Sequence, residues 1–266
     1  MKAKLNIQVS VHGGISFLKQ NYVSPPFKIA NITEDKLAAC LHLTLMSSSP
    51  GILDGDDYQI NIDLDEGSSL HLHTQSYQRL FDMKTGARQS MNVVLEKNAS
   101  LVYLPHPCVP HQNSIFRSIN HIHLKEGASL VWGEILTCGR KLNGEVFQMT
   151  YLQIFTSIYF NQKLIIKENL FMEPAHIEPN LLGQMEGYSH QGSLMVLNEE
   201  IEIPELRIEI TGLLESQKNI DFGITASPIK GLLVRILGNK AEQIHDLQKS
   251  IAQLLVNQKT KAEIVE

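Results

Sequence analysis

Hydrophobic and polar residues alternate along much of the chain, which is typical of strands that bury one face. Alternating runs begin at residues 5, 41, 60 and 154, and a short one covers residues 201–203. Helical spacing is clear only near the C-terminus, where Ile244, Leu247 and Ile251 recur three and four residues apart. A weaker helical candidate covers residues 193–198. The pattern predicts a mainly β protein with few helices, one of them C-terminal.

An internal repeat is the strongest signal for architecture. Residues 60–72, 91–103 and 120–132 can each be written as a strand, a four-residue turn and a second strand that opens with Ser-Leu. Gly67, Asn98 and Gly127 occupy the same turn position, and these residue types tolerate a positive φ. One such unit cannot bury its apolar face alone, whereas stacked units can. We therefore expect a layered, right-handed β-helix-like stack of sheets, with chance similarity among hairpins as the alternative.

The sequence also predicts the domain organisation. No linker or low-complexity stretch divides the 266 residues, so we expect a single domain over residues 1–266. Its repeat-bearing β body covers about residues 1–237, and the C-terminal helix covers about residues 239–258.

Composition narrows the classes of protein that the chain can belong to. Hydrophobic residues make up 43% and charged residues 19%, which is ordinary globular composition. A net charge of −5 gives no electrostatic reason to expect a nucleic acid partner. Three scattered cysteines do not make a disulfide framework or a paired zinc site. The first nine residues lack the apolar segment of a signal peptide, and no apolar run is long enough to span a bilayer. We expect a cytoplasmic protein without membrane contact.

Histidines offer the first candidate chemistry. His71 with His73, and His121 with His123, each place two imidazoles on one face of a strand, as metal sites do. No acidic residue follows the first pair at the spacing of a cupin site, and Glu126 after the second lies in the repeat's turn. The leucines and isoleucines that alternate with these histidines are expected on the opposite, core-facing side of each strand. These histidines are therefore expected on the outer faces of the strands.

A proline-stiffened segment offers a second candidate. Cys108 lies in residues 106–111 with His106 and His111, so a thiol and two imidazoles could gather on one loop and bind a metal ion. No fixed ligand spacing supports this site, and a buried cysteine without chemistry is the alternative.

Parity along the strands points to polar residues inside the body. Stepping by twos from the apolar positions leads to Asp56 in one strand and, through Thr74, to Ser76 in another. The same step leads from Leu130 and Trp132 to Glu134, and from Leu164 and Ile166 to Glu168. A buried carboxylate needs a partner, water or an ion. The four positions predict a wet interior that can briefly hold a cation, unless a bulge or turn resets the parity.

Several short motifs are spread over essentially the whole chain. They are residues 24–28 (Ser-Pro-Pro-Phe-Lys), 49–56 (Ser-Pro-Gly-Ile-Leu-Asp-Gly-Asp), 74–79 (Thr-Gln-Ser-Tyr-Gln-Arg), 107–110 (Pro-Cys-Val-Pro), 134–140 (Glu-Ile-Leu-Thr-Cys-Gly-Arg) with Gly144-Glu145, and 231–238 (Gly-Leu-Leu-Val-Arg-Ile-Leu-Gly). In this order they resemble the motifs of the urease accessory protein UreD (UreH) family. One departure is His111, where the family usually has an aromatic residue. The family's layered β-sheet fold agrees with the repeat.

The resemblance implies a chaperone for nickel insertion and not an enzyme. Its implied partners are UreF, through it the GTPase UreG, and the urease structural subunits. Its implied cargo is Ni²⁺ in transit through an internal passage, with no tightly bound cofactor, and GTP belongs to the partner GTPase. By resemblance the passage residues are Asp56, Ser76, Glu134 and Glu168. Gly55, Gly139 and Arg140 match structural positions of the family's motifs, with Arg140 expected to pair with an interior carboxylate or with carbonyls.

The sequence is also compatible with two other classes of function. A metal-dependent enzyme on a β-helix or barrel would use Glu134, Glu168 and nearby histidines, and would hold one metal ion tightly. A pure interaction module would bind partners around a polar but dry core. The conduit differs from both, because spaced oxygen ligands would hold Ni²⁺ weakly and let it exchange.

Overall fold

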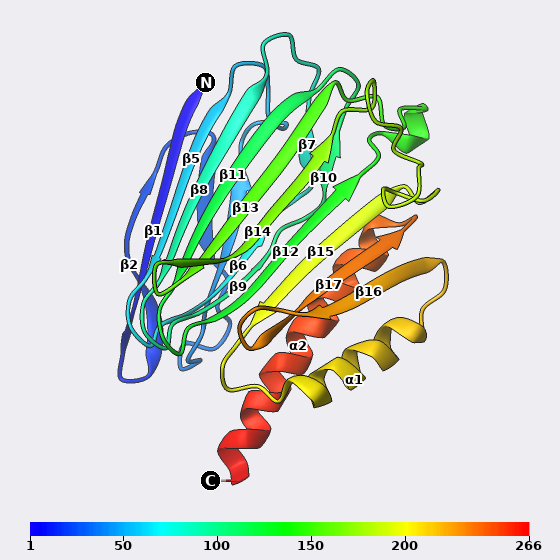
Figure 1. Ribbon diagram of the computed structural model, residues 1–266. Helices are drawn as coiled ribbons and strands as arrows, with labels where there is room; N and C mark the ends of the chain where they lie inside the picture. Colours follow the sequence, from blue (N-terminus) through cyan, green and yellow to red (C-terminus); the bar gives the residue numbers. More distant parts are fainter. Residues whose placement is uncertain (266) are drawn as a thin grey trace.

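The computed structural model describes residues 1–265, with side chains through Leu255, and it consists of two facing β-sheets with helices on one side (Figure 1). Within the described residues, the seven-stranded sheet has the order β14-β13-β11-β8-β5-β1-β2. These strands are β1 (Lys2–His12), β2 (Ile15–Val23), β5 (Asp57–Leu64), β8 (Ala87–Leu95), β11 (Ile115–Leu124), β13 (Tyr151–Phe160) and β14 (Lys163–Met172).

The second sheet has ten strands within the same part of the chain, in the order β16-β17-β15-β12-β9-β6-β4-β3, with β7 and β10 attached beside β12. These strands are β3 (Phe27–Asn31), β4 (Leu41–Ser47), β6 (Ser69–Thr74), β7 (Gln78–Leu80), β9 (Ser100–Leu104), β10 (Cys108–Pro110), β12 (Ser129–Thr137), β15 (His190–Leu197), β16 (Ile220–Ala226) and β17 (Gly231–Gly238). The described helices are the short 3-10 turn η1 (Lys141–Asn143), α1 (Ile203–Glu215) and α2 (Ala241–Val265).

The repeat is the reason for this arrangement. The chain passes from the seven-stranded to the ten-stranded sheet in the pairs β5–β6, β8–β9 and β11–β12, and each strand lies parallel to its counterpart in the next pair. Ser69, Ser100 and Ser129 are neighbours across the three strands. Gly67, Asn98 and Gly127 have φ of +69°, +58° and +69° in the connecting turns. The prediction that these segments are stacked equivalents is thus confirmed.

The prediction of a mainly β protein with few helices is also confirmed, since 51% of the residues lie in strands and the C-terminal helix is present. The right-handed, β-helix-like character of the stack stays a prediction, as does the single-domain organisation. The C-terminal helix is α2, from Ala241 to Val265, and it extends beyond the expected residues 239–258.

Three local predictions are wrong. Residues 193–198 form no helix, because residues 193–197 lie in strand β15 and Asn198 follows it. Ile201 precedes helix α1 and Ile203 begins it, so residues 201–203 form no strand. Leu164 is 45% exposed although its alternation with Ile166 predicts burial. The neighbouring strand β13 has a register shift between Ile158 and Tyr159. This irregularity interrupts the alternation of buried and exposed side chains at this point.

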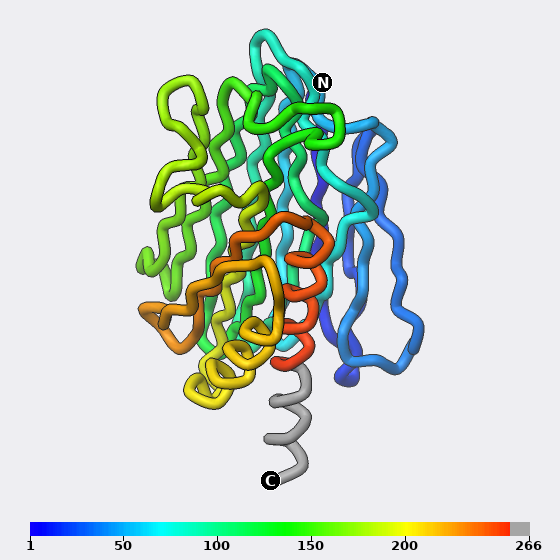
Figure 2. The backbone as a smooth tube through the Cα atoms, turned by 90° about the vertical axis from the view of Figure 1, so that its right-hand side faces the viewer, coloured from blue at the N-terminus to red at the C-terminus, as the bar shows by residue number. Residues whose placement is uncertain are grey.

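Two apolar cores hold the layers together. The first fills the space between the sheets and includes Leu5, Ile62 and Leu101. The second lies on the outer face of the ten-stranded sheet, where α2 packs on β12, β15 and β17, and α1 on β16 and β17 (Figure 2). The apolar stripe of α2 around Ile244 and Ile251 is buried in this second core, so this part of the helix is an internal cap. Neither helix combines the length and apolar character needed to cross a membrane in the described chain.

Candidate functional site

A row of polar side chains crosses the interior face of the seven-stranded sheet. The members lie on adjacent strands in register: Tyr58, Gln89 and Ser118 in one row, and Asn120, Thr156 and Glu168 two residues further along. All six continue strand faces whose other members are apolar. We call these six side chains, together with the residues that face them from the ten-stranded sheet (Glu134, Ser193 and Arg235), the polar belt.

The ten-stranded sheet supplies the other half of the belt. Glu134, Ser193 and Arg235 are neighbours across β12, β15 and β17. The Oε1 atom of Glu168 forms an ion pair with Arg235 Nη2 at 2.7 Å and accepts a hydrogen bond from Ser193 Oγ at 3.3 Å. This contact ties the edge of one sheet to the other, and it leaves Glu168, at 9% exposure, neutralised by a guanidinium.

Glu134 is held in a different way. Its Oε1 accepts hydrogen bonds from Trp132 Nε1 at 2.9 Å, and from Asn120 Nδ2 and Thr156 Oγ1 at 3.1 Å each. Among the described side chains no cation pairs with this carboxylate. Burial raises the pKa of Glu134 to about 7, and the nearby Glu168 adds to the rise, while the hydrogen bonds oppose it. Glu134 can therefore change its charge near neutral pH.

Two small cavities lie beside the polar belt, and belt residues line both of them. One, of about 70 Å³, is lined by Glu134, Asn120 and Cys108. The other, of about 100 Å³, is lined by Tyr58 and Ser76. They share four lining residues, which are Thr74, Gln78, Gln89 and Tyr103. Both are large enough for water, and the polar lining supplies partners for it.

Ser76 lines the second cavity, and Asp56 contacts the hydroxyl of Tyr58, another residue of that lining. Asp56 is 4% exposed, and its carboxylate accepts from the amino group of Met1 at 2.7 Å, from Leu53 N at 2.8 Å and from the Tyr58 hydroxyl at 2.9 Å. Burial raises the pKa of Asp56, but these donors outweigh it and lower the pKa overall. Ser76 is exposed, because β6 ends at Thr74 and a bend follows. Its inward parity therefore stops at the strand end, and it lies at the rim of the second cavity.

Comparison with known proteins agrees with this arrangement of motifs. The family model of the UreD urease accessory protein matches residues 1–265. The chain belongs to the UreD family. A urease accessory protein UreD of Flavobacterium johnsoniae is 46% identical over 253 residues, which cover 95% of this chain and 91% of the relative. UreD proteins of Actinobacillus pleuropneumoniae serotype 3 and Acetivibrio thermocellus are 36% and 32% identical, and each match covers 96% of this chain and 97% of the relative.

These relatives are named for an accessory role and not for a reaction, which agrees with the expectation that this UreD-family chain is not an enzyme. The name also implies urease-associated partners and a place in urease maturation.

The proline-stiffened segment does not gather its three candidate ligands. Cys108 is 5% exposed and faces the Glu134 cavity, and burial raises its thiol pKa to about 12. His106 contacts Thr74 Oγ1 through Nδ1 at 3.0 Å, and its ring lies 4.7 Å from that of His245. His111 packs against Phe81, with ring centroids 4.8 Å apart. In the described chain these three residues form no group of three metal donors.

The residues carried over from family motifs as structural occupy turns. Gly55 has a φ of +77° directly before Asp56, and Gly139 has a φ of +116°. A Cβ on Gly139 would lie 2.8 Å from the carbonyl oxygen of Pro110, so this position needs glycine. Arg140 pairs with Glu145, with Nε 2.8 Å from Oε2. The partner of Arg140 is thus a residue of the same surface loop and not a carboxylate between the sheets.

Most members of the belt were missed from the sequence, among them Asn120, Thr156 and Arg235. Asn120 and Thr156 lie two residues before apolar inward positions of β11 and β13, so the parity that found Glu134 also applies to them. Arg235 could not be found in this way, because it is 55% exposed and reaches Glu168 only through the folding of β17 next to β15.

Proposed function

We propose that this UreD-family chain is a chaperone for nickel insertion into urease, and that it conducts Ni²⁺ along the polar belt between its two sheets. UreF and, through it, the GTPase UreG are the proposed partners on one side, with apo-urease on the other and the cytoplasm as the location. The family supports the association with urease, and the belt supports the route.

The observation that carries the route is the state of Glu134. It is a carboxylate that borders a water-sized cavity, takes three neutral donors and has no cationic partner among the described side chains. A passing divalent cation would compensate the charge that the fold leaves unpaired. Carboxylate and hydroxyl oxygens hold Ni²⁺ less tightly than a set of imidazoles or thiolates, so the ion can move on.

The other two acidic residues would take part differently. Glu168 already binds Arg235, and Asp56 already binds the amino group of Met1. An ion reaching either carboxylate must displace a positive charge first. We infer that Glu134 is the one belt carboxylate ready to receive Ni²⁺ without rearrangement, and that Asp56 and Glu168 act after their partners move.

The test is co-expression with the urease structural subunits and the other accessory proteins, reading urease activity and bound nickel. Omitting the chain should lower both, and adding it back should restore them. Glu134→Gln keeps the size of the side chain and removes its charge, so it should retain partner binding and lower the nickel content of urease severalfold. Asp56→Ala should do the same.

Asp63→Ala is the matched control, because Asp63 lies on the same strand as Tyr58 but is exposed. Its urease should load nickel as the wild type does. Normal nickel content with Glu134→Gln and Asp56→Ala would exclude the passage, and would leave an interaction module with a polar but dry core.

The enzyme alternative lacks a donor set to support it. Glu134 and Glu168 belong to no group of three metal-ligating side chains in the described chain. Glu168 is occupied by Arg235. A tightly bound, stoichiometric metal that is lost with Glu134→Gln would favour the enzyme over the conduit.

A further inference from the structure

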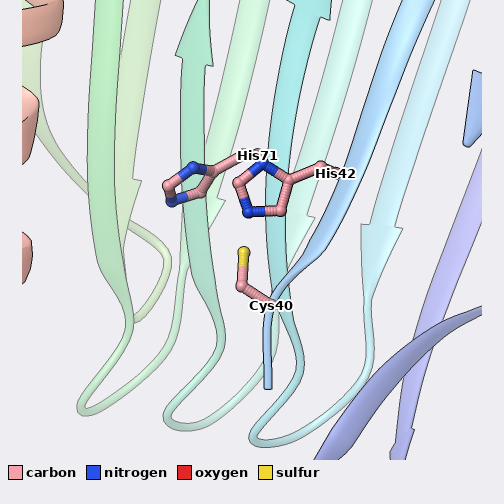
Figure 3. A group of neighbouring side chains, drawn as sticks. All are labelled: Cys40, His42 and His71. Carbon is pink, nitrogen blue, oxygen red and sulfur yellow. The ribbon is translucent and has the colours of Figure 1, made fainter. Parts of the chain in front are cut away.

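A cluster of three metal-ligating side chains lies outside the polar belt, on the outer face of the ten-stranded sheet. Cys40 Sγ and one ring nitrogen each of His42 and His71 all lie within 4.8 Å of one another. Figure 3 shows the sulfur beside the two imidazoles, which extend from neighbouring strands. The described part of the chain holds no second group of three such donors. We call Cys40, His42 and His71 the outer cluster.

The strand register is the reason that the three side chains meet. His42 of β4 and His71 of β6 are direct neighbours in the parallel ladder. Cys40 precedes His42 by two residues and therefore lies on the same side of the chain. Leu41 lies between Cys40 and His42, and Leu70 directly precedes His71. Both leucines point to the opposite face and are 2% and 0% exposed. The inter-sheet core thus forms without the outer cluster.

The three side chains are accessible. All three are half-buried, so an ion can reach them from solvent. The His42 and His71 rings lie 4.6 Å apart at an angle of 53°.

We propose that Cys40, His42 and His71 bind one divalent transition-metal ion of borderline softness, such as Zn²⁺, Co²⁺ or Ni²⁺. One thiolate and two imidazoles are the donor types that tetrahedral sites for such ions use, with Zn–S near 2.3 Å and Zn–N near 2.0–2.1 Å in general. The fourth position is open to water or to a donor of another molecule. Binding replaces the thiol proton by the metal ion and releases that proton to solvent.

This site differs in chemistry from the belt. The belt offers oxygen atoms from carboxylates, hydroxyls and amides, whereas the outer cluster offers sulfur and nitrogen. The outer cluster is therefore expected to hold its ion more tightly than the belt does. The inference does not depend on conduction through the belt, and the two can fail separately.

The experiment is titration of the full chain with Co²⁺, which reports thiolate ligation through a charge-transfer absorption. The wild type should show this band at one equivalent, and Zn²⁺ or Ni²⁺ should displace Co²⁺ and abolish it. Cys40→Ser should lose the band, and His71→Asn should weaken Co²⁺ binding at least about tenfold, the lower end of what even supporting residues of metal sites contribute.

The control variant is His121→Asn combined with His123→Asn. It removes a pair of imidazoles from the other sheet, and Co²⁺ binding should stay unchanged. A second readout is alkylation by iodoacetamide. Cys108 and Cys138 are buried, at 5% and 0% exposure, so Cys40 should react first in the folded chain, and Zn²⁺ should protect it. Absence of the thiolate band in the wild type, or a band that persists in Cys40→Ser, would overturn the proposal.

Discussion

At the scale of the residue, the buried carboxylates differ in which groups compensate their negative charge. Asp56 has an amino group and Glu168 a guanidinium, whereas Glu134 has only neutral donors. Burial without a cation raises the pKa of Glu134 to about 7 from an ordinary value of 4.5. The protonated form is therefore the one that the fold prefers, and the charged form is the one that suits a cation.

This shift predicts how stability depends on pH. Because the folded pKa is above the unfolded one, the stabilisation is fully present below about pH 4.5 and is lost as the pH rises through about 7. Glu134→Gln cannot ionise, so its free energy of unfolding should exceed that of the wild type increasingly from pH 5 to pH 8, by on the order of 2–3 kcal/mol at the upper end. Urea unfolding at several pH values measures this.

The control for this prediction is Glu96→Gln, which removes a carboxylate from an exposed turn of the repeat. Curves for Glu134→Gln and wild type that stay parallel across this pH range would contradict the raised pKa.

At the scale of the element, helix α2 packs against the outer side of the strands that carry part of the polar belt. The Nε2 atom of Gln248 donates to the carbonyl oxygens of Glu134 at 3.3 Å and Ser193 at 3.0 Å, and Gln248 is fully buried. The helix approaches this closely because β15 has a glycine beneath it. A Cβ at Gly192 would overlap Cγ2 of Ile244. The helix thereby holds the two strands that carry one half of the belt.

A pair of glycine substitutions tests this docking. Gly192→Ala should push α2 away and lower the free energy of unfolding by about 1–3 kcal/mol, the usual cost of overpacking. Gly212→Ala is the matched change in the last turn of α1, where a Cβ meets no atom within 4 Å. It should raise the free energy of unfolding by about 0.5–1 kcal/mol, because alanine loses less backbone entropy in a helix. Equal effects of the two substitutions in urea unfolding would contradict close docking of α2.

At the scale of the whole molecule, the site exists only because the chain alternates between two sheets. Each pair of strands in the repeat contributes one strand to each face of the interior, so polar groups far apart in sequence come to face one another. Glu168 and Arg235 are the clearest case, since they join the β14 edge of one sheet to β17 of the other. Under the proposed function this ion pair is a barrier that a passing ion must open.

Removal of the barrier should change how long the ion stays. Arg235→Gln leaves Glu168 without its cation, close enough to Glu134 for their charges to interact. Two uncompensated carboxylates should hold a divalent cation more tightly, so the isolated variant should retain severalfold more Ni²⁺ after gel filtration, and urease should receive less. Lys230→Gln is the control, because Lys230 is exposed and its one ion pair among the described side chains is with Glu202 at the surface. Equal retention by both variants would exclude Glu168 from the route.

Several features were predictable from the sequence alone, and each depends on local physics. Alternation identified strands β1, β4, β5 and β13, because side chains of a strand point to opposite faces in turn. The repeat identified the turns, since Gly67, Asn98 and Gly127 tolerate the positive φ that such turns need. Parity placed Asp56, Glu134 and Glu168 inside, and the family motifs agreed.

Alternation along a strand gave wrong predictions where the strand pairing is interrupted. It also does not predict which side chains contact one another. A bulge exposed Leu164, and the end of β6 left Ser76 at the rim. Alternation fixes the face of one strand, but contacts between faces depend on the register and on how the sheets stack. The tertiary structure alone therefore decided that Glu168 meets Arg235 and that Cys40 meets His71, because these pairs are separated in sequence and joined only through neighbouring strands.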